Sequence, residues 1–556
     1  MIPRKDESKM IKPESLTARN AFSFTEQPYL KNLFEVVTKG NTKISFVVGA
    51  GVSLDAGLPG WQSLINDICK QIANKTFRRL ALADRADLMR KAEFVLQMVI
   101  RETTKMEDAI ICEALYKREK NVVPGELAKA IVRLGVGLGD RARLLTTNFD
   151  QVLETALLDY LPESKIESMG LQRRRAWGNR SRGGAGNVLH LHGMVIPNNT
   201  SQGPLILSES QFLAAGPDVR KIILKQLENS CVIFVGVSIT DPNLTGPLWD
   251  ARERTITDRP FVLIVPEPVR PSFSDADAKN YALEKAVYLE EKLKMRPIFL
   301  KSYSQLIQVF WDLGLAYADP EKYGHGLDSK TVGAGPKYYG VRFKNTLSSC
   351  YKEIGCGPGV DWPTGEKARK LSNKLFESLS DKGPVGKLLT EISRRHHMGN
   401  EYFGLFLWLR AREYDGNKAP YELNLVGTST YVHREAWSGQ KRTAIVANSA
   451  FPAARAVFRG AYLTGNIDSE NPNATWRGTL AVPIRIVDAS SYDPKKPYGR
   501  DIITVGAITL DTNKLVTGPG NIKSTDRSVL WAADRDEKLK LATCLQELAE
   551  KILQTP

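Results

Sequence analysis

The chain has 556 residues, of which 42% are hydrophobic and 25% charged, a balance typical of globular proteins with two to four domains. No run approaches the roughly 18 apolar residues of a membrane-spanning helix, and the charged N-terminus lacks the apolar segment of a secretory signal. We therefore expect a cytoplasmic protein with no membrane partner. The net charge of +15 leaves two interpretations open, a surface that attracts nucleic acid or acidic ligands and a basic surface that binds nothing.

The first half of the chain alternates between strand-like and helix-like segments. Residues 1–28 are polar and are expected to form an N-terminal arm. Buried apolar strands that alternate with helices predict an α/β domain with a doubly wound parallel sheet over residues 29–318. The expected strands are 44–48, 143–147, 188–192, 232–235, 261–265 and 297–300, and the expected helices include 61–74, 151–160 and 304–313.

The composition changes after residue 318. Glycine-containing polar segments predict a boundary, and we expect a linker and helical segment over residues 319–384. Residues 385–556 are expected to form a second, α+β domain with antiparallel strands. The strands expected there are 423–426, 443–446, 480–487 and 504–510, with helices at 452–459 and about 538–553.

A glycine-containing turn follows the first expected strand. Gly49, Ala50, Gly51 and Ser53 stand where glycines let a backbone approach a pyrophosphate and a helix N-terminus meets its charge. The turn departs from the standard dinucleotide fingerprint, because Leu54 occupies the place of the third glycine. Taken alone, it is equally compatible with an ordinary tight turn. A P-loop ATPase is not expected, since the chain has no Walker-type loop.

Four further polar segments follow in order, three of them at the ends of expected strands. Because ligands of open α/β sheets bind at the carboxyl ends of the strands, these segments should converge on one crevice with the glycine turn. The residues that we expect to contact a nucleotide there are Pro59, Trp61, Thr147, Asp150, Gly236, Ser238 and Asp241, together with the catalytic candidates Asn148 and His192.

This ordered set resembles the sirtuin family over roughly residues 30–315. The turn is similar to the family's Gly-Ala-Gly-x-Ser motif, residues 147–150 to its Gln-Asn-Ile-Asp motif, and His192-Gly193 to its catalytic His-Gly. Gly236 and Ser238 resemble its Gly-Thr-Ser element. The departures are Thr147 in place of glutamine and Trp61 in a segment that replaces Asp-Phe-Arg.

The zinc module of protein-deacylating sirtuins has no counterpart here. The segment between His192 and Gly236 contains one cysteine, Cys231, whereas a structural zinc needs four ligands. We therefore expect no metal and no deacylase activity. The pattern resembles the bacterial antiphage branch of the family, whose members hydrolyse NAD+, and NAD+ is accordingly the expected substrate.

The resemblance implies a role for each polar group. Asn148 would position ribose and water, and His192 would act as the base. Asp150 would accept from a ribose hydroxyl or orient its loop, and Trp61 would cover the nicotinamide. His190 is expected to be structural, because a regular strand places it about 6–7 Å further from the strand's carboxyl end.

Two segments keep open interpretations. Asp241, Pro242 and Asn243 form either part of the nucleotide site or only an Asx turn that opens a helix. The arginines of residues 173–182 form either a solvated loop or a loop that binds phosphate or a partner.

The second domain resembles GAF-type sensor domains, and residues 454–460, 476–484 and 505–511 carry the likeness. Such domains bind small molecules or only dimerise. The expected partners are a second copy of the chain and, at this domain, a phage-derived or small-molecule trigger or a partner protein. Nucleic acid is an alternative that we do not favour.

The leading hypothesis is a regulated NAD+ hydrolase that depletes NAD+ in antiphage defence by abortive infection. One alternative is the sirtuin-like subunit of a nucleic-acid-guided short Argonaute-type complex, which the length and charge favour and the GAF-like pattern does not. Another is a non-catalytic nucleotide sensor, against which the intact Asn148 and His192 argue.

Overall fold

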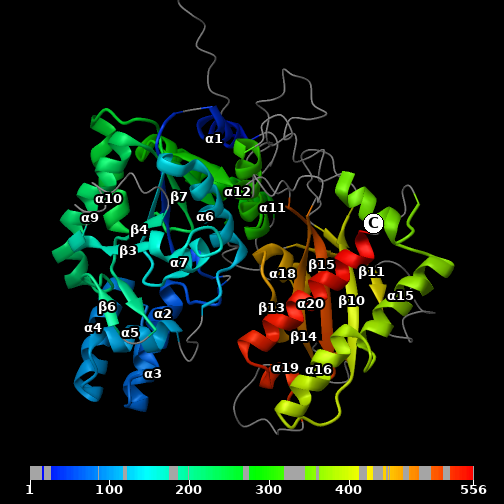
Figure 1. Ribbon diagram of the computed structural model, residues 1–556. Coiled ribbons are helices and arrows are strands. Elements are labelled where there is room, and N and C mark those ends of the chain that lie inside the picture. The colour runs from blue at the N-terminus through cyan, green and yellow to red at the C-terminus, as the bar shows by residue number, and fades with distance from the viewer. Residues whose placement is uncertain are drawn as a thin grey trace, which may run out of the picture.

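The computed structural model describes residues 16–17, 27–39, 41–54, 56–85, 87–116, 122–173, 186–197, 200–266, 275–318, 345–357, 362–411, 422–429, 442–445, 449, 451–467, 475–487, 502–516 and 526–554. Most of the predicted N-terminal arm, residues 1–28, and the first part of the predicted linker, residues 319–344, lie outside these ranges. An N-terminal α/β unit and a C-terminal unit with an antiparallel sheet lie side by side (Figure 1).

The N-terminal unit is built on a parallel sheet. Within the described residues its seven strands have the order β3-β4-β2-β1-β7-β8-β9, and every neighbouring pair is parallel. The predicted fold class is confirmed, and β3 is a strand that the sequence analysis missed. The strands are β1 (Ile44–Val48), β2 (Ala142–Thr146), β3 (Glu167–Gly170), β4 (Asn187–His190), β7 (Cys231–Val235), β8 (Phe261–Ile264) and β9 (Arg296–Phe299).

Both faces of this sheet are covered, as expected for strands that are apolar on both sides. In β1, Phe46 and Val48 pack into one hydrophobic core and Val47 into the other. Helices α1 (Pro28–Lys39), α6 (Glu126–Leu138), α7 (Val152–Leu157) and α12 (Tyr303–Ala318) contribute to the first core, and α9 (Glu209–Asn229) and α10 (Pro242–Asp250) to the second. The unit also contains α11 (Asp275–Val287) and the hairpin strands β5 (Met194–Ile196) and β6 (Thr200–Gln202).

Four helices are inserted between β1 and α6 and lie together beneath the sheet in Figure 1. They are α2 (Trp61–Cys69), α3 (Lys75–Ala83), α4 (Leu88–Thr103) and α5 (Glu107–Tyr116). Local chemistry sets their starts, since the side chain of Asn74 caps α3 and that of Asp87 caps α4. The helix expected over residues 61–74 ends at Cys69.

The C-terminal unit has a sheet whose described strands are ordered β12-β11-β10-β15-β14-β13, with every pair antiparallel. Its strands are β10 (Phe403–Arg410), β11 (Glu422–Thr428), β12 (Arg442–Ala444), β13 (Leu463–Asn466), β14 (Gly478–Val487) and β15 (Ile502–Thr512). The expected start of the sheet after residue 421 is too late, because β10 is one of its inner strands. This strand is a nearly unbroken apolar run, since both of its faces are covered.

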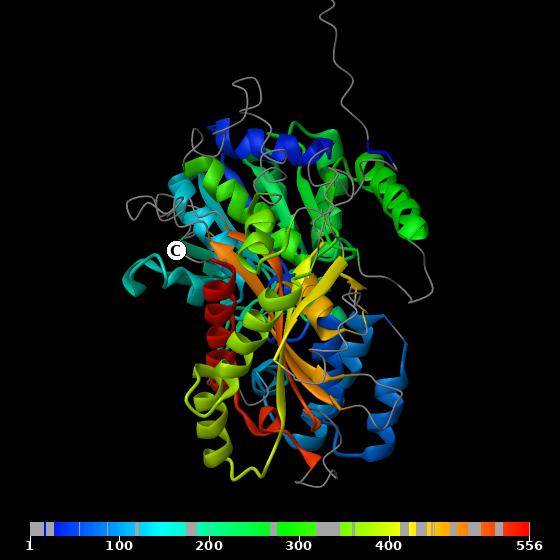
Figure 2. The ribbon, with the colours of Figure 1, turned by 90° about the vertical axis from the view of Figure 1, so that its right-hand side faces the viewer.

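Helices lie on both faces of the antiparallel sheet. Phe406 and Trp408 of β10 pack with α18 (Pro452–Arg459), and Leu405 and Leu407 face the opposite core. Figure 2 shows α20 (Arg535–Leu553), in red, running along that opposite side. The other helices of the unit are α15 (Gly365–Leu379), α16 (Pro384–Arg395) and α19 (Val529–Ala532).

Helix α12 joins the two units. The ring of Tyr303 lies 6.2 Å from that of Phe458, and Arg410 donates to the hydroxyl of Ser304 over 3.2 Å. Gly460 ends α18 in the left-handed region, and a Cβ there would lie 2.5 Å from the side chain of Ile307. The left-handed backbone and this close approach explain why a glycine follows the helix. Among the described residues, no helix is long and apolar enough to cross a membrane.

Candidate functional site

The glycines of the turn after β1 allow two loops to touch. Gly49 N–H donates to the carbonyl of Val235 and Gly51 N–H to that of Gly236, both over 2.9 Å. A Cβ on Gly49 would lie 2.6 Å from the Gly236 oxygen, and Gly236 itself has a φ of 65°. These three glycines are required by the packing of the β1 and β7 loops, whether or not a nucleotide binds.

Asn148 is held from two sides at the end of β2. Its backbone N–H donates to Thr146 Oγ1 over 3.0 Å, and its side-chain Nδ2 donates to Ser53 Oγ over 2.8 Å. Ser53 is buried and comes from the glycine turn, so the first and second motifs meet through this bond. The convergence expected from the strand ends is present for these two residues.

Asp150, the last residue of the segment after β2, bonds to its own loop. It is buried, and its Oδ1 accepts from the N–H of Val152 over 3.0 Å. Burial raises the pKa of this carboxyl, against the opposing effect of hydrogen bonds from Val152 and Ser53. Of its two expected roles, these contacts favour orienting the loop.

His192 lies two residues beyond the end of β4 and is completely buried. Neither of its ring nitrogens has a hydrogen-bond partner among the described residues, although Asp241 Oδ2 lies 3.5 Å from Nε2. Burial lowers the pKa of this imidazole, and the Asp241 charge opposes that effect. A histidine in this state is neutral near pH 7 and can accept a proton.

Two aromatic side chains surround His192. The ring of Trp61, at the start of α2, lies 6.3 Å from the imidazole, and that of Phe212 on α9 lies 5.2 Å from it, both edge-on. Phe212 was not among the predicted site residues, because it sits within a long helical pattern with nothing to distinguish it. Contact with these rings contributes to the burial of the imidazole, and burial disfavours its charged form.

Asp241 both forms an Asx turn and lies beside His192, so both of the interpretations that the sequence left open apply to it. Its Oδ1 accepts from Asn243 N–H over 2.8 Å and caps α10, while Oδ2 faces His192. The Asx turn is therefore real, and it also brings a charge to the candidate base. Asn243 Nδ2 is buried without a hydrogen-bond partner in the described part of the chain.

The remaining predicted site residues make contacts with other residues than His192. Thr147 N–H donates to the carbonyl of Val48, and Ala50 opens the 3-10 turn after β1. Ser238 is exposed and its hydroxyl pairs with Thr240 over 2.6 Å, and Pro59 is half-buried just before α2. Among the described residues, the ring contacts and the ion pair of His192 involve Trp61, Phe212 and Asp241, and none of these four residues.

The expected place of His190 is wrong. β4 ends at His190, so this residue is at the carboxyl end of the strand and not deeper in the sheet. Its Nδ1 lies 3.0 Å from the carbonyl oxygen of Asn148, and its Nε2 lies 2.7 Å from Glu154 Oε1. The sequence predicts a strand that runs two residues further than β4, because Leu191 and His192 continue the apolar-polar alternation.

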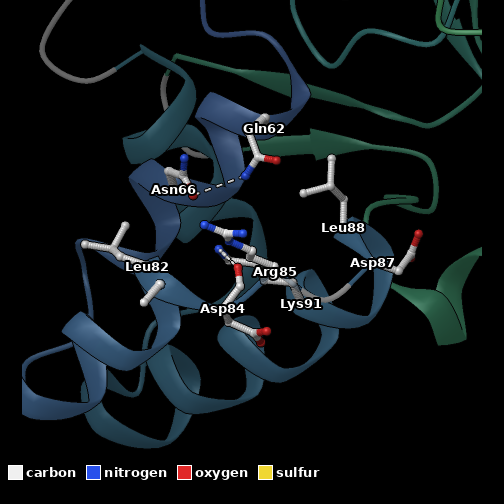
Figure 3. Close-up of a pocket in the computed structure, with 9 residues that line it drawn as sticks. Gln62, Asn66, Leu82, Asp84, Arg85, Asp87, Leu88 and Lys91 are labelled. Atoms are coloured by element: carbon white, nitrogen blue, oxygen red, sulfur yellow. Dashed lines mark hydrogen bonds between the residues drawn. The ribbon is translucent and has the colours of Figure 1, made fainter. Parts of the chain in front are cut away.

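A separate hollow of about 660 Å³ lies among α2, α3 and α4 (Figure 3). Gln62 and Asn66 line it from α2, and Lys91, whose ammonium donates to the carbonyl of Asp84, lines it from α4. No predicted site residue lines this hollow. In the arginine-containing loop, Arg173 pairs with Glu167 over 2.5 Å, and residues 174–182 lie outside the described part of the chain.

Comparison with known proteins supports the assignment of the parallel-sheet unit. Residues 142–295 match the family model of a SIR2-like domain, from the first residue of β2 to the residue before β9. That segment contains Asn148, His192 and Asp241. No curated protein matches the chain. The chain therefore contains a SIR2-like domain, a type of domain typical of enzymes that use NAD+.

Proposed function

We propose that the protein hydrolyses NAD+ to nicotinamide and ADP-ribose. The observation that carries this proposal is that two buried polar residues lie just beyond the carboxyl ends of the adjacent strands β2 and β4. Asn148 is anchored through Ser53, and His192 is neutral and free of hydrogen bonds among the described residues. A binding site without chemistry would have little use for an unpaired buried imidazole, because such a group costs free energy to bury.

The proposed reaction breaks the bond between nicotinamide and ribose, through an oxocarbenium-like state as in glycoside hydrolysis. The bonding electrons leave with nicotinamide, which departs as a neutral molecule and needs no strong acid. Water adds to the ribose carbon, and its proton passes to His192. Asn148 positions the ribose and the water, and Trp61 shields the nicotinamide end.

We further propose that the C-terminal unit is a GAF-like domain that regulates this site. Arg535, the first residue of α20, donates to the carbonyl of Ala56 and, over 3.1 Å, to that of Val123. Ala56 N–H in turn donates to the carbonyl of Ser53, which holds Asn148. A movement of α20 would therefore displace the segment of Ala56 and, through it, the glycine turn.

The start of α20 is itself fixed within the C-terminal unit. Glu537 is buried and accepts from Arg395 over 2.7 Å, and its other oxygen lies 2.8 Å from His396 Nε2. A phage-derived or small-molecule trigger, or a partner protein, that shifts α16 would therefore shift Arg535. We propose domains at 29–318 and 385–556, with α15 of the intervening segment packed on β10 and β11, and assembly as a homo-oligomer.

We propose that the reaction serves antiphage defence by depleting NAD+. The test is to incubate the full chain with NAD+, with and without phage lysate, and to measure nicotinamide, using Asn148→Ala as the matched control. Release by the wild-type chain that the lysate stimulates and the variant lacks supports the proposal. Release that requires an acylated peptide, or that Asn148→Ala retains, contradicts it.

A further inference from the structure

A buried chain of polar contacts reaches the backbone carbonyl of Asn148, whose side chain contacts Ser53. Glu154 on α7 contacts His190 at the end of β4, and His190 contacts the backbone carbonyl of Asn148. Ser168 on β3 donates to the same Glu154 oxygen over 2.7 Å. His190, Glu154 and Asn148 are all less than 10% exposed, so bulk water does not compete for these bonds.

The partners fix where the protons of His190 must be. A carbonyl oxygen can only accept, so Nδ1 must carry a proton and donate it to Asn148. Nε2 then faces the carboxylate of Glu154, which orients the ring as a carboxylate orients a donor histidine. Burial acts to lower the pKa of His190, but the charge of Glu154 and the bonds to Glu154 and Asn148 outweigh it and raise the pKa.

Three groups of Asn148, its backbone N–H, its side-chain Nδ2 and its backbone carbonyl, each have a hydrogen-bond partner. Thr146 receives its backbone N–H, Ser53 receives its side-chain amide, and His190 donates to its carbonyl. Without the last bond, the buried carbonyl of Asn148 would lose its donor, and the backbone from which the Asn148 side chain extends would be held less firmly. Misplacement of a positioning group by about 1 Å can cost about 100-fold in rate.

We propose that His190 is a positioning residue for the hydrolysis of NAD+, and that Glu154 acts through it. The inference rests on the proposed function, because it assigns His190 a role only through Asn148. In the described part of the chain, the ring nitrogens of His190 contact Asn148 and Glu154, and neither contacts His192. The effect of His190 is to hold the Asn148 peptide in one orientation.

Two substitutions of His190 separate the effect of its hydrogen bond to Asn148 from the effect of replacing its side chain by a smaller one. In His190→Asn the side-chain amide lies near the place of Nδ1 and can still donate to Asn148. In His190→Gln the amide reaches the place of Nε2, near Glu154, and leaves the Asn148 carbonyl without its donor. We expect His190→Asn to keep kcat within about threefold of wild type and His190→Gln to lose about 100-fold, with little change in KM for either.

A measurement without substrate keeps the test independent of the proposed function. The chain has six histidines, so selective ¹⁵N labelling and assignment by the His190→Asn variant should identify a solvent-protected Nδ1–H of His190. Equal loss of kcat in both variants at equal thermal stability, or no loss in either, overturns the positioning role. A rapidly exchanging Nδ1–H also overturns it. Absence of turnover in the wild-type chain with a protected Nδ1–H would instead refute the proposed function.

Discussion

The surroundings of His192 predict how the rate depends on pH. If the neutral imidazole is the base, protonation inactivates the enzyme, and a pKa lowered by burial places that loss below the ordinary histidine value of about 6.5. Asp241 is the charged side chain that faces the ring among the described residues, 3.5 Å away, and Trp61 and Phe212 are its apolar neighbours. The rate should therefore be constant from about pH 7 upward and fall only at lower pH.

Asp241→Asn should move this acid limb further down. Asparagine caps a helix as well as aspartate does, so α10 should keep its start. Removing an opposite charge at this distance ordinarily changes a pKa by about 1 to 3, and because Asp241 is 16% exposed we take the low end, about one pH unit. The wild-type limb is itself expected below 6.5.

The assay is kcat/KM for NAD+ from pH 4.5 to 8 on both proteins, with folding checked at each pH. A limb centred at or above 6.5 in the wild-type chain would refute the assignment of a buried, neutral base. A limb that Asp241→Asn leaves in place or moves upward would refute the pairing of His192 with Asp241.

Three further predictions follow from other parts of the molecule. His192→Gln and Asn148→Ala should lower kcat by about 10²–10⁴, with much smaller changes in NAD+ affinity, as measured by steady-state kinetics and calorimetry; weak binding with unchanged kcat would contradict the roles. Arg535→Ala should loosen the loop at Ala56, so amide exchange there should quicken and turnover fall about tenfold, and unchanged exchange would remove this link between the units. Asp511 is half-buried in β15, and desolvation of its carboxyl raises its pKa to about 7. Its folded pKa thus exceeds its unfolded value of 3.8, and stability should fall by up to about 4 kcal/mol as pH rises from 4 to 8; Asp511→Asn should flatten that fall in denaturant titrations, and an unchanged slope would contradict it.

Sequence patterns predicted the parallel sheet well, because its strands are short apolar runs closed by polar loops. The runs 44–48 and 232–235 need no context to be seen as buried strands. β3 was missed because its residues, Glu-Ser-Met-Gly, carry no strand pattern and pair only with β4 at the sheet edge. β10 was missed because eight nearly continuous apolar residues are equally typical of a buried helix.

The site was predictable where a residue type is tied to a strand end, and not where tertiary packing decides. Asn148 and Ser53 were expected in one crevice and share a hydrogen bond. Phe212 lies on a 21-residue helix, and only its packing brings it against His192. The contact of Arg535 with Ala56 joins residues that are 479 positions apart, and no local pattern can indicate such a pair.

The proposed reaction adds water to NAD+ at the nicotinamide–ribose bond. A time course of nicotinamide and ADP-ribose released by the activated full chain, without acylated peptide and with a metal chelator present, tests it. We expect the two products to appear at equal rates in a one-to-one ratio. Nicotinamide without matching ADP-ribose, or release that the chelator abolishes, would contradict it.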